Sequence, residues 1–381
     1  MVPAVAVYFY LRNCVESVVQ RHLRAEDAEF ADEIADFVEQ FWPQPEIVLQ
    51  AHRDRWRDAL LSRGWSVPSW PRALGGQDWT DMQQYLWFRT CRQAGVPSEW
   101  DAGTTLVGPA LFHQDTHFAQ QRLAEIVQLR QRWCVAQHGL SVTQAQRSDS
   151  GWTLQGEKSG VIDGNDADWM LLQAQLDDAT DGWFCVSTTA AGVELGPPHS
   201  LDGQLCSVIK LNQVNVSAAA YVPAVQWSDG PFDGLSGLLQ RFAGAVEGQL
   251  DASPVASEVQ IALAGLQAME ARWLAARQQG QPLPFPAAVL RLKGEEIFTQ
   301  LGDLLIDSFG YYALPDVDAA LSHNAPPLQP EGPPEGSQRL AQLGGVRRML
   351  GQIMARSGQL DPLLRDQIAQ SLWQGDAGDQ R

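Results

Sequence analysis

The segment Gly64-Trp65-Ser66-Val67-Pro68-Ser69-Trp70-Pro71-Arg72-Ala73-Leu74-Gly75-Gly76 interrupts a helical pattern near the start of the chain. Its prolines block helix continuation and its paired glycines permit a tight turn, so the segment predicts a structured loop between helices. On both sides of it, from about residue 15 to residue 130, apolar side chains recur every three or four residues, as at Phe30, Ile34 and Phe37. This spacing is typical of amphipathic helices, so the first third of the chain is predicted to be helical.

The pattern changes after residue 130. Short apolar segments bounded by Gly, Asp and Asn continue to about residue 235, and segments such as 169–172 and 183–186 are typical of β-strands. From about residue 236 the helical spacing returns. We therefore expect an α+β chain with an all-helical domain at residues 1–130, a β domain at 131–235 and a helical-bundle domain at 236–381.

The composition argues against several classes of partner. The 381 residues include 27 Lys and Arg against 45 Asp and Glu, so the net charge is −18. A nucleic-acid binder needs a basic face and electrostatic docking on anionic lipid needs basic residues, so neither partner is expected. An apolar run at residues 2–11 is too short for a bilayer span, which takes roughly 20 residues. The five cysteines form no Cys-x-x-Cys pair, which is typical of free thiols in a reducing cytoplasm.

The histidines give no sign of a metal site. His113 and His117 are four residues apart, but no carboxylate or thiolate follows at a spacing typical of zinc ligands. We expect no bound metal.

Short strings rich in Trp and Gly occur along the chain in a distinctive order. Trp70-Pro71 is followed by Gly75-Gly76, and Gly108-Pro109 comes further on. The β region then contains Arg132-Trp133-Cys134, Gly156-Glu157-Lys158 and Ala167-Asp168-Trp169. In this order and spacing the strings resemble the acyl-CoA dehydrogenase family, over roughly residues 25–365.

The C-terminal strings resemble one branch of that family. Leu292-Lys293-Gly294-Glu295-Glu296-Ile297 and Phe309-Gly310-Tyr311-Tyr312-Ala313-Leu314-Pro315 are similar to members that have separate large and small subunits. Some of those members act on steroid side chains or dicarboxylic acyl-CoAs. The resemblance implies an N-terminal helical domain, a middle β-barrel or sandwich and a C-terminal four-helix bundle.

The resemblance also implies an activity. Family members use FAD to dehydrogenate an acyl-CoA thioester between its α and β carbons, in the breakdown of fatty-acid, steroid side-chain or dicarboxylic acyl-CoAs. A carboxylate takes the α proton and the flavin takes the β hydride. The expected partners are the acyl-CoA substrate, a sibling acyl-CoA dehydrogenase subunit and an electron-transfer flavoprotein, in a homo- or hetero-oligomer that is a dimer or a tetramer.

The segments that carry the flavin in active members are altered here. The resemblance assigns flavin binding to Trp133, Gly139, Ser141 and Lys158. Active members have Ser-Glu-Pro-x-Ala-Gly-Ser-Asp after the Trp-Cys string, whereas residues 135–143 of this chain lack the acidic-proline segment. Active members also carry a Trp-Thr or Trp-Ser pair after the lysine, where this chain has Gly160 and Val161. Neither residue offers an aromatic face or a hydroxyl to a flavin ring.

The catalytic carboxylate is displaced as well. Many members carry it in a Tyr-Glu-Gly-Thr string, where this chain has Leu343-Gly344-Gly345-Val346 with Gly344 in place of Glu. Glu247 is the best candidate for a relocated base, as found on an earlier helix in the branch that this chain resembles. Its alternative is a solvated helix residue. Glu295 and Glu296 are weaker candidates, because carboxylates near Lys293 more often form surface pairs.

The nucleotide end of the flavin is also weakly represented. Members often have Arg-x-x-Phe-Gly where the dimer partner receives the nucleotide, and this chain has Arg277-Gln278-Gln279-Gly280. Arg277 and Gln279 are therefore candidate contacts to a phosphate of the cofactor.

Three functions remain open from the sequence. The first is an FAD-dependent acyl-CoA dehydrogenase with its base relocated to Glu247. The second is a non-catalytic partner subunit that lacks its own flavin and base and buttresses the active site of a sibling chain. The third is an acyl-thioester binding protein with no redox role.

Overall fold

The described part of the chain comprises nearly all of its middle. The computed structural model describes residues 23–43, 49–96, 102–137, 142–149, 151–201, 204–223, 225, 236–237, 239–240, 243, 254–283 and 285–309. Helices occupy both ends of this part and strands its middle, in the order expected from the sequence. The exact domain boundaries stay a prediction. None of the described helices is long and apolar enough to cross a bilayer.

The chain folds into two compact units. The helical unit contains four of the described helices: α2 (Ala25–Phe41), α4 (Asp81–Ala94), α8 (Pro254–Gln278) and α9 (Ala287–Phe309). The β unit contains the strands and the helices α3 (Gln50–Arg63), α5 (Gly108–Leu111) and α6 (His117–Val127).

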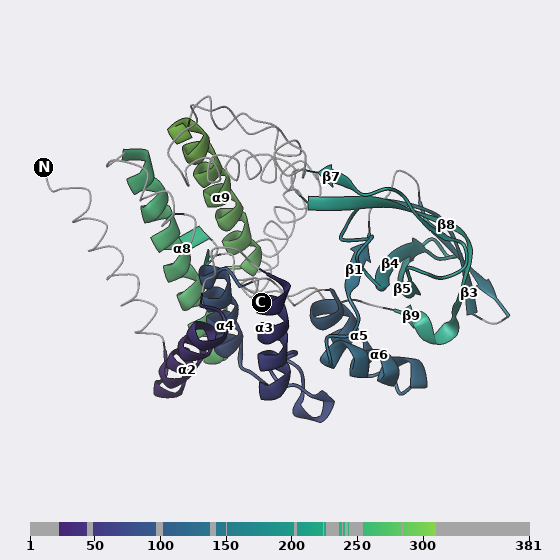
Figure 1. The fold of residues 1–381 in the computed structure, drawn as a ribbon, viewed down its shortest axis with the longest axis horizontal. Helices are drawn as coiled ribbons and strands as arrows, with labels where there is room; N and C mark the ends of the chain where they lie inside the picture. Colours follow the sequence, from purple (N-terminus) through teal and green to yellow (C-terminus); the bar gives the residue numbers. More distant parts are fainter. Residues whose placement is uncertain are drawn as a thin grey trace, which may run out of the picture. The chain divides into compact units, whose positions relative to one another are not determined.

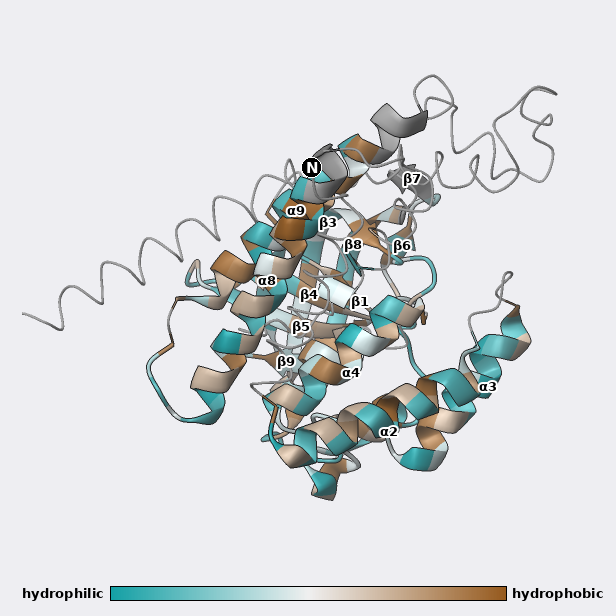
Figure 2. Ribbon diagram, turned by 90° about the vertical axis from the view of Figure 1, so that its left-hand side faces the viewer, coloured by the Kyte–Doolittle hydropathy of each residue, from teal (hydrophilic) through white to brown (hydrophobic). Residues whose placement is uncertain are grey.

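Amphipathic helices form the helical unit. Helix α4 packs on both α2 and α8, and α8 lies beside α9 (Figure 1). Phe30, Ile34 and Phe37 are buried on one face of α2, as their spacing predicts. Trp79 contacts Phe30 edge-on at 4.8 Å between ring centroids. Brown and teal segments alternate along these helices in Figure 2, because each helix carries apolar side chains toward its neighbours and polar ones toward water.

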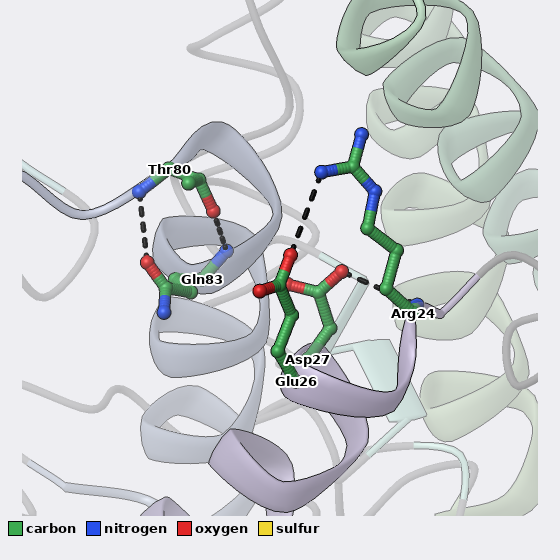
Figure 3. A network of polar contacts seen from close by, with 5 residues as sticks. All are labelled: Arg24, Glu26, Asp27, Thr80 and Gln83. Carbon is green, nitrogen blue, oxygen red and sulfur yellow. Dashed lines mark hydrogen bonds and ion pairs between the residues drawn. The ribbon is translucent and has the colours of Figure 1, made fainter.

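Side chains satisfy the first backbone N–H groups of two helices (Figure 3). At the start of α4 the Thr80 hydroxyl accepts a hydrogen bond from the Gln83 N–H at 3.3 Å, and the Gln83 side chain accepts one from the Thr80 N–H at 2.9 Å. This reciprocal capping box fixes where α4 begins. At the start of α2, Asp27 accepts from the Arg24 N–H at 3.3 Å, and Glu26 pairs with the Arg24 guanidinium at 3.5 Å.

The β unit is built on one mixed sheet. Its strand order is β6-β8-β3-β2-β4-β5-β9, with β1 parallel to β4 and β7 beside β8. The strands are β1 (Trp133–Ala136), β2 (Gln144–Ser148), β3 (Gly151–Ile162), β4 (Trp169–Gln175), β5 (Asp181–Ser187), β6 (Val193–Leu195), β7 (His199–Leu201), β8 (Gln204–Ser217) and β9 (Tyr221–Val222). The segments predicted as strands at residues 169–172 and 183–186 are confirmed.

Side chains alternate between two cores on the faces of this sheet. Leu154, Phe184 and Ile209 belong to one apolar cluster. Trp133, Leu171 and Cys185 belong to a second cluster, in which they meet apolar residues of α5 and α6. Because successive strand residues point to opposite faces, β1, β4 and β5 contribute buried residues to both cores.

The loop at residues 64–76 is fixed by the indole of Trp70. Its Nε1–H donates to the carbonyl oxygen of Thr104 at 2.9 Å, within a π-helical turn, η2 (Gly103–Val107). A Cβ at Gly108 would lie 1.9 Å from the indole ring, and one at Gly76 would lie 2.0 Å from the Trp70 carbonyl oxygen. Two glycines far apart in sequence are thus required by the same tryptophan.

The replacement Gly108→Ala tests this slot. The new methyl group must displace the indole or open the turn, so the free energy of unfolding should fall by about 1–3 kcal/mol. Gly265→Ala is the matched control, because Gly265 is an exposed residue of α8 and no atom lies within 4 Å of its Cβ position. Alanine should stabilise that helix by up to roughly 1 kcal/mol. Urea unfolding of both variants measures the difference, and an unchanged midpoint for Gly108→Ala would contradict the account.

Candidate functional site

Lys158 carries a buried amine at the middle of β3. The residue is 4% exposed, and its Nζ donates to the carbonyl oxygen of Gln137 at 2.9 Å, just after β1 ends. Burial lowers the pKa of the Lys158 ammonium to about 8, and the Asp181 carboxylate offsets this only in part. Among the described residues, no carboxylate forms an ion pair with it. The lysine that the resemblance assigns to the cofactor is therefore engaged inside the β unit.

The end of β3 presents a bare surface. A bulge lies between Lys158 and Val161 in the pairing of β3 with β8. Gly160 has a φ of +63° and no atom within 4 Å of its Cβ position. Val161 is 2% exposed, whereas Ile162 is 46% exposed. The outward positions are thus Gly160 and Ile162, with Val161 pointing into the core. The sequence pattern missed Ile162, although an apolar residue next to a buried one in an alternating strand is the signal for it.

Trp133 and Cys134 are core residues. Trp133 is 3% exposed and stacks on Trp169 with 5.5 Å between ring centroids. The guanidinium of Arg122, on α6, lies 4.4 Å from the Trp169 ring on the same side of the sheet. Cys134 is 3% exposed, so its thiol packs in the core. A contact between Trp133 and a cofactor stays a prediction.

Arg277 lies in the last turn of α8 and is paired within the helical unit. Its Nε donates to a carboxylate oxygen of Asp81, at the start of α4. Its guanidinium also lies 5.2 Å from the ring of Trp273. Gln279 is exposed just beyond the helix end. The Asp81 carboxylate therefore neutralises the positive charge of Arg277, the residue that the sequence predicts to contact a phosphate.

The remaining candidates divide into two groups. Glu247, Gly139, Ser141 and Gly344 lie outside the described residues. Glu295 and Glu296 form ion pairs along α9, Glu295 with Arg291 at 3.5 Å and Glu296 with Lys293 at 3.1 Å, as their spacing predicts.

A buried carboxylate in the helical unit escaped the sequence analysis. Glu270 is 4% exposed on α8 and accepts a hydrogen bond from the Tyr85 hydroxyl of α4 at 2.9 Å. Burial, assisted by the Glu270 charge, raises the pKa of Tyr85 well above its ordinary value. The helical period gave a signal, because Glu270 lies four residues from both Leu266 and Leu274, which are buried.

Among the described residues, no cluster of three or more His, Cys, Asp or Glu side chains is arranged to hold a metal ion.

Solved structures share this architecture. The Tcur3481-Tcur3483 steroid ACAD superposes with a TM-score of 0.70 at 18% identity, over 93% of this chain and 98% of that chain. The ChsE4-ChsE5 complex from Mycobacterium tuberculosis gives a TM-score of 0.67 at 18% identity, over 92% and 98% of the two chains. An acyl-CoA dehydrogenase from Geobacillus kaustophilus gives a TM-score of 0.62 at 13% identity, over 92% and 99%.

The chain has the acyl-CoA dehydrogenase fold. This confirms the fold class expected from the Trp- and Gly-rich strings. By sequence alone, no family model matches the chain. No curated protein matches it either.

The described residues do not fit the flavin that the fold family implies. A flavin ring packs well on an aromatic side chain, and the exposed or half-exposed residues at the end of β3 are Ser159, Gly160 and Ile162, none of which is aromatic. A dinucleotide needs a free cation for its phosphates, and Arg277 is bound to Asp81. Lys158 is committed to a backbone carbonyl. We therefore assign no reaction step through a flavin to these residues.

The replacement Lys158→Met tests the burial of the amine through pH dependence. The Lys158 pKa is about 8 in the folded chain, against an ordinary value of 10.5. Between these pH values the unfolded chain binds more protons than the folded chain. The free energy of unfolding of the wild type should therefore rise with pH relative to that of Lys158→Met. The full rise is at most roughly 3 kcal/mol and disappears below pH 8, where both states hold the proton. Urea unfolding of both proteins at several pH values measures it, and a constant difference between them would refute the burial effect.

Proposed function

We propose that the chain is a subunit of a heteromeric acyl-CoA dehydrogenase and leaves the flavin to its sibling chain. The assembled complex would carry out the FAD-dependent α,β-dehydrogenation of an acyl-CoA thioester, from fatty-acid, steroid side-chain or dicarboxylic catabolism. One observation carries the proposal. The fold extends along almost the whole chain, while the exposed or half-exposed residues at the end of β3 are Ser159, Gly160 and Ile162, none of which has an aromatic ring to pack on a flavin.

The proposal follows from what the reaction requires. A carboxylate must reach the α proton, and FAD supplies the acceptor for the β hydride when it is bound. Among the described carboxylates, Glu270 is bonded to Tyr85, while Glu295 and Glu296 pair with basic residues of their own helix. The contribution of this chain is then structural. Its compact β unit and helical unit would support a sibling that carries the flavin and the base.

Two features support an assembly with a second chain. The solved Tcur3481-Tcur3483 steroid ACAD and the ChsE4-ChsE5 complex share the fold, and both bear the names of two proteins. The C-terminal strings also resemble the branch with large and small subunits. An electron-transfer flavoprotein is the proposed redox partner of the complex.

A lone enzyme with Glu247 as its base is the alternative function. It needs a flavin bound to this chain alone, and no described residue favours it over the subunit proposal. The flavin content of the isolated chain separates the two.

The full-length chain, purified alone, should be colourless in the flavin absorbance bands. Co-expression with an acyl-CoA dehydrogenase sibling from the same source should give a yellow complex that dehydrogenates acyl-CoA, because the sibling supplies the flavin surface. Absorbance spectra of the two preparations measure this, and the sibling expressed alone serves as the control. A yellow isolated chain with one flavin per molecule would overturn the subunit proposal and support the lone enzyme.

A further inference from the structure

The ion pair between Asp81 and Arg277 joins two helix ends of opposite polarity. Asp81 is the first residue of α4, and Arg277 lies in the last turn of α8. A helix N-terminus carries partial positive charge and a helix C-terminus carries partial negative charge. The carboxylate and the guanidinium therefore each sit at the helix end that favours their charge, and each also favours the other. Their side chains are 30% and 33% exposed, so water screens the pair only in part.

The same geometry describes where a phosphate would bind. The backbone N–H groups at a helix N-terminus together with an arginine form a common anion site. At α4 the first residue is Asp81 itself, whose carboxylate pairs with Arg277, and the Gln83 N–H is already donated to the Thr80 hydroxyl. Trp273 packs against the guanidinium of Arg277 at 5.2 Å and holds it near α4. A carboxylate of the chain itself thus takes the place of an external anion.

We propose that Asp81 acts as a built-in substitute for a nucleotide phosphate and withholds Arg277 from the pyrophosphate of a dinucleotide. A tethered carboxylate is present at an effective concentration far above that of a free nucleotide. A nucleotide must therefore break the pair and place its own negative charge beside Asp81. This inference rests on the proposed function, in which the chain binds no flavin of its own. It explains why Arg277, the candidate phosphate-binding arginine, holds no nucleotide.

The test measures ADP binding to the full-length chain by equilibrium dialysis. ADP has the phosphates of the dinucleotide and lacks the flavin ring, so it reports on Arg277 and not on β3. Three variants are compared with wild type: Asp81→Asn, Asp81→Asn with Arg277→Gln, and Asp78→Asn. The last is the matched control, because Asp78 forms an exposed pair with Arg72 at 3.6 Å and its loss changes the net charge equally.

Asp81→Asn should bind ADP at least about tenfold more tightly than wild type. Adding Arg277→Gln should remove that gain, and Asp78→Asn should bind ADP as wild type does. Equal affinity in Asp81→Asn and wild type would overturn the proposal. So would tight ADP binding by wild type that Arg277→Gln weakens. If Asp81→Asn fails to fold, as seen by circular dichroism, Asp81→Ser keeps an oxygen at the helix start and replaces it.

The ADP-binding experiment can fail while the proposed function holds, and the reverse is also true. A yellow wild-type chain that still gains ADP affinity in Asp81→Asn would sink the subunit function and leave the ion-pair proposal standing. A colourless wild-type chain that binds ADP through Arg277 would sink the ion-pair proposal alone.

Discussion

The indole of Trp70 packs directly against Gly108, and the helical side of the β unit depends on that contact. A buried tryptophan removes roughly 150–250 Å² from water, which corresponds to an upper value of about 4–6 kcal/mol. Gly108 admits the ring and Thr104 supplies the carbonyl for its N–H. The ring also contacts Phe112 edge-on at 5.1 Å. The loop, the π-helical turn and α5 are thereby fixed together, and the core that α5 and α6 share with β1 and β4 can form.

The helical unit is organised by polar contacts between α4 and α8. Tyr85 meets Glu270 in the interior, and Asp81 meets Arg277 nearer the surface. Buried polar pairs contribute little net stability, because desolvation offsets their attraction, but breaking one leaves a costly unpaired group. Their effect is to select one register between two helices that apolar packing alone would leave less defined. The second contact also occupies Arg277, the candidate phosphate-binding residue.

The sequence predicted the elements better than it predicted the site. The spacing of Phe30, Ile34 and Phe37 placed α2, and the loop around Trp70 was recognised from its prolines and glycines. The partner of Arg277 was not predictable, because Asp81 lies 196 positions away in the chain and its charge resembles that of any exposed helix residue. The alternation around Val161 was a local signal for an outward Ile162, but the bulge after Lys158 was not predictable, because it is a property of strand pairing with β8. The local spacing of apolar residues predicts which face of a helix or strand is buried. The site depends instead on which helices and strands, far apart in the sequence, pack together.

The central claim is that this chain keeps the acyl-CoA dehydrogenase fold while holding no flavin of its own. Native mass spectrometry of the complex, co-purified with its sibling chain, tests it most directly, because it counts chains and cofactors in the same particle. The account predicts one FAD for each sibling chain and none for this chain, and this chain should leave the complex without added mass when the complex is dissociated. A count of one FAD for every chain, or release of this chain with FAD attached, would contradict it.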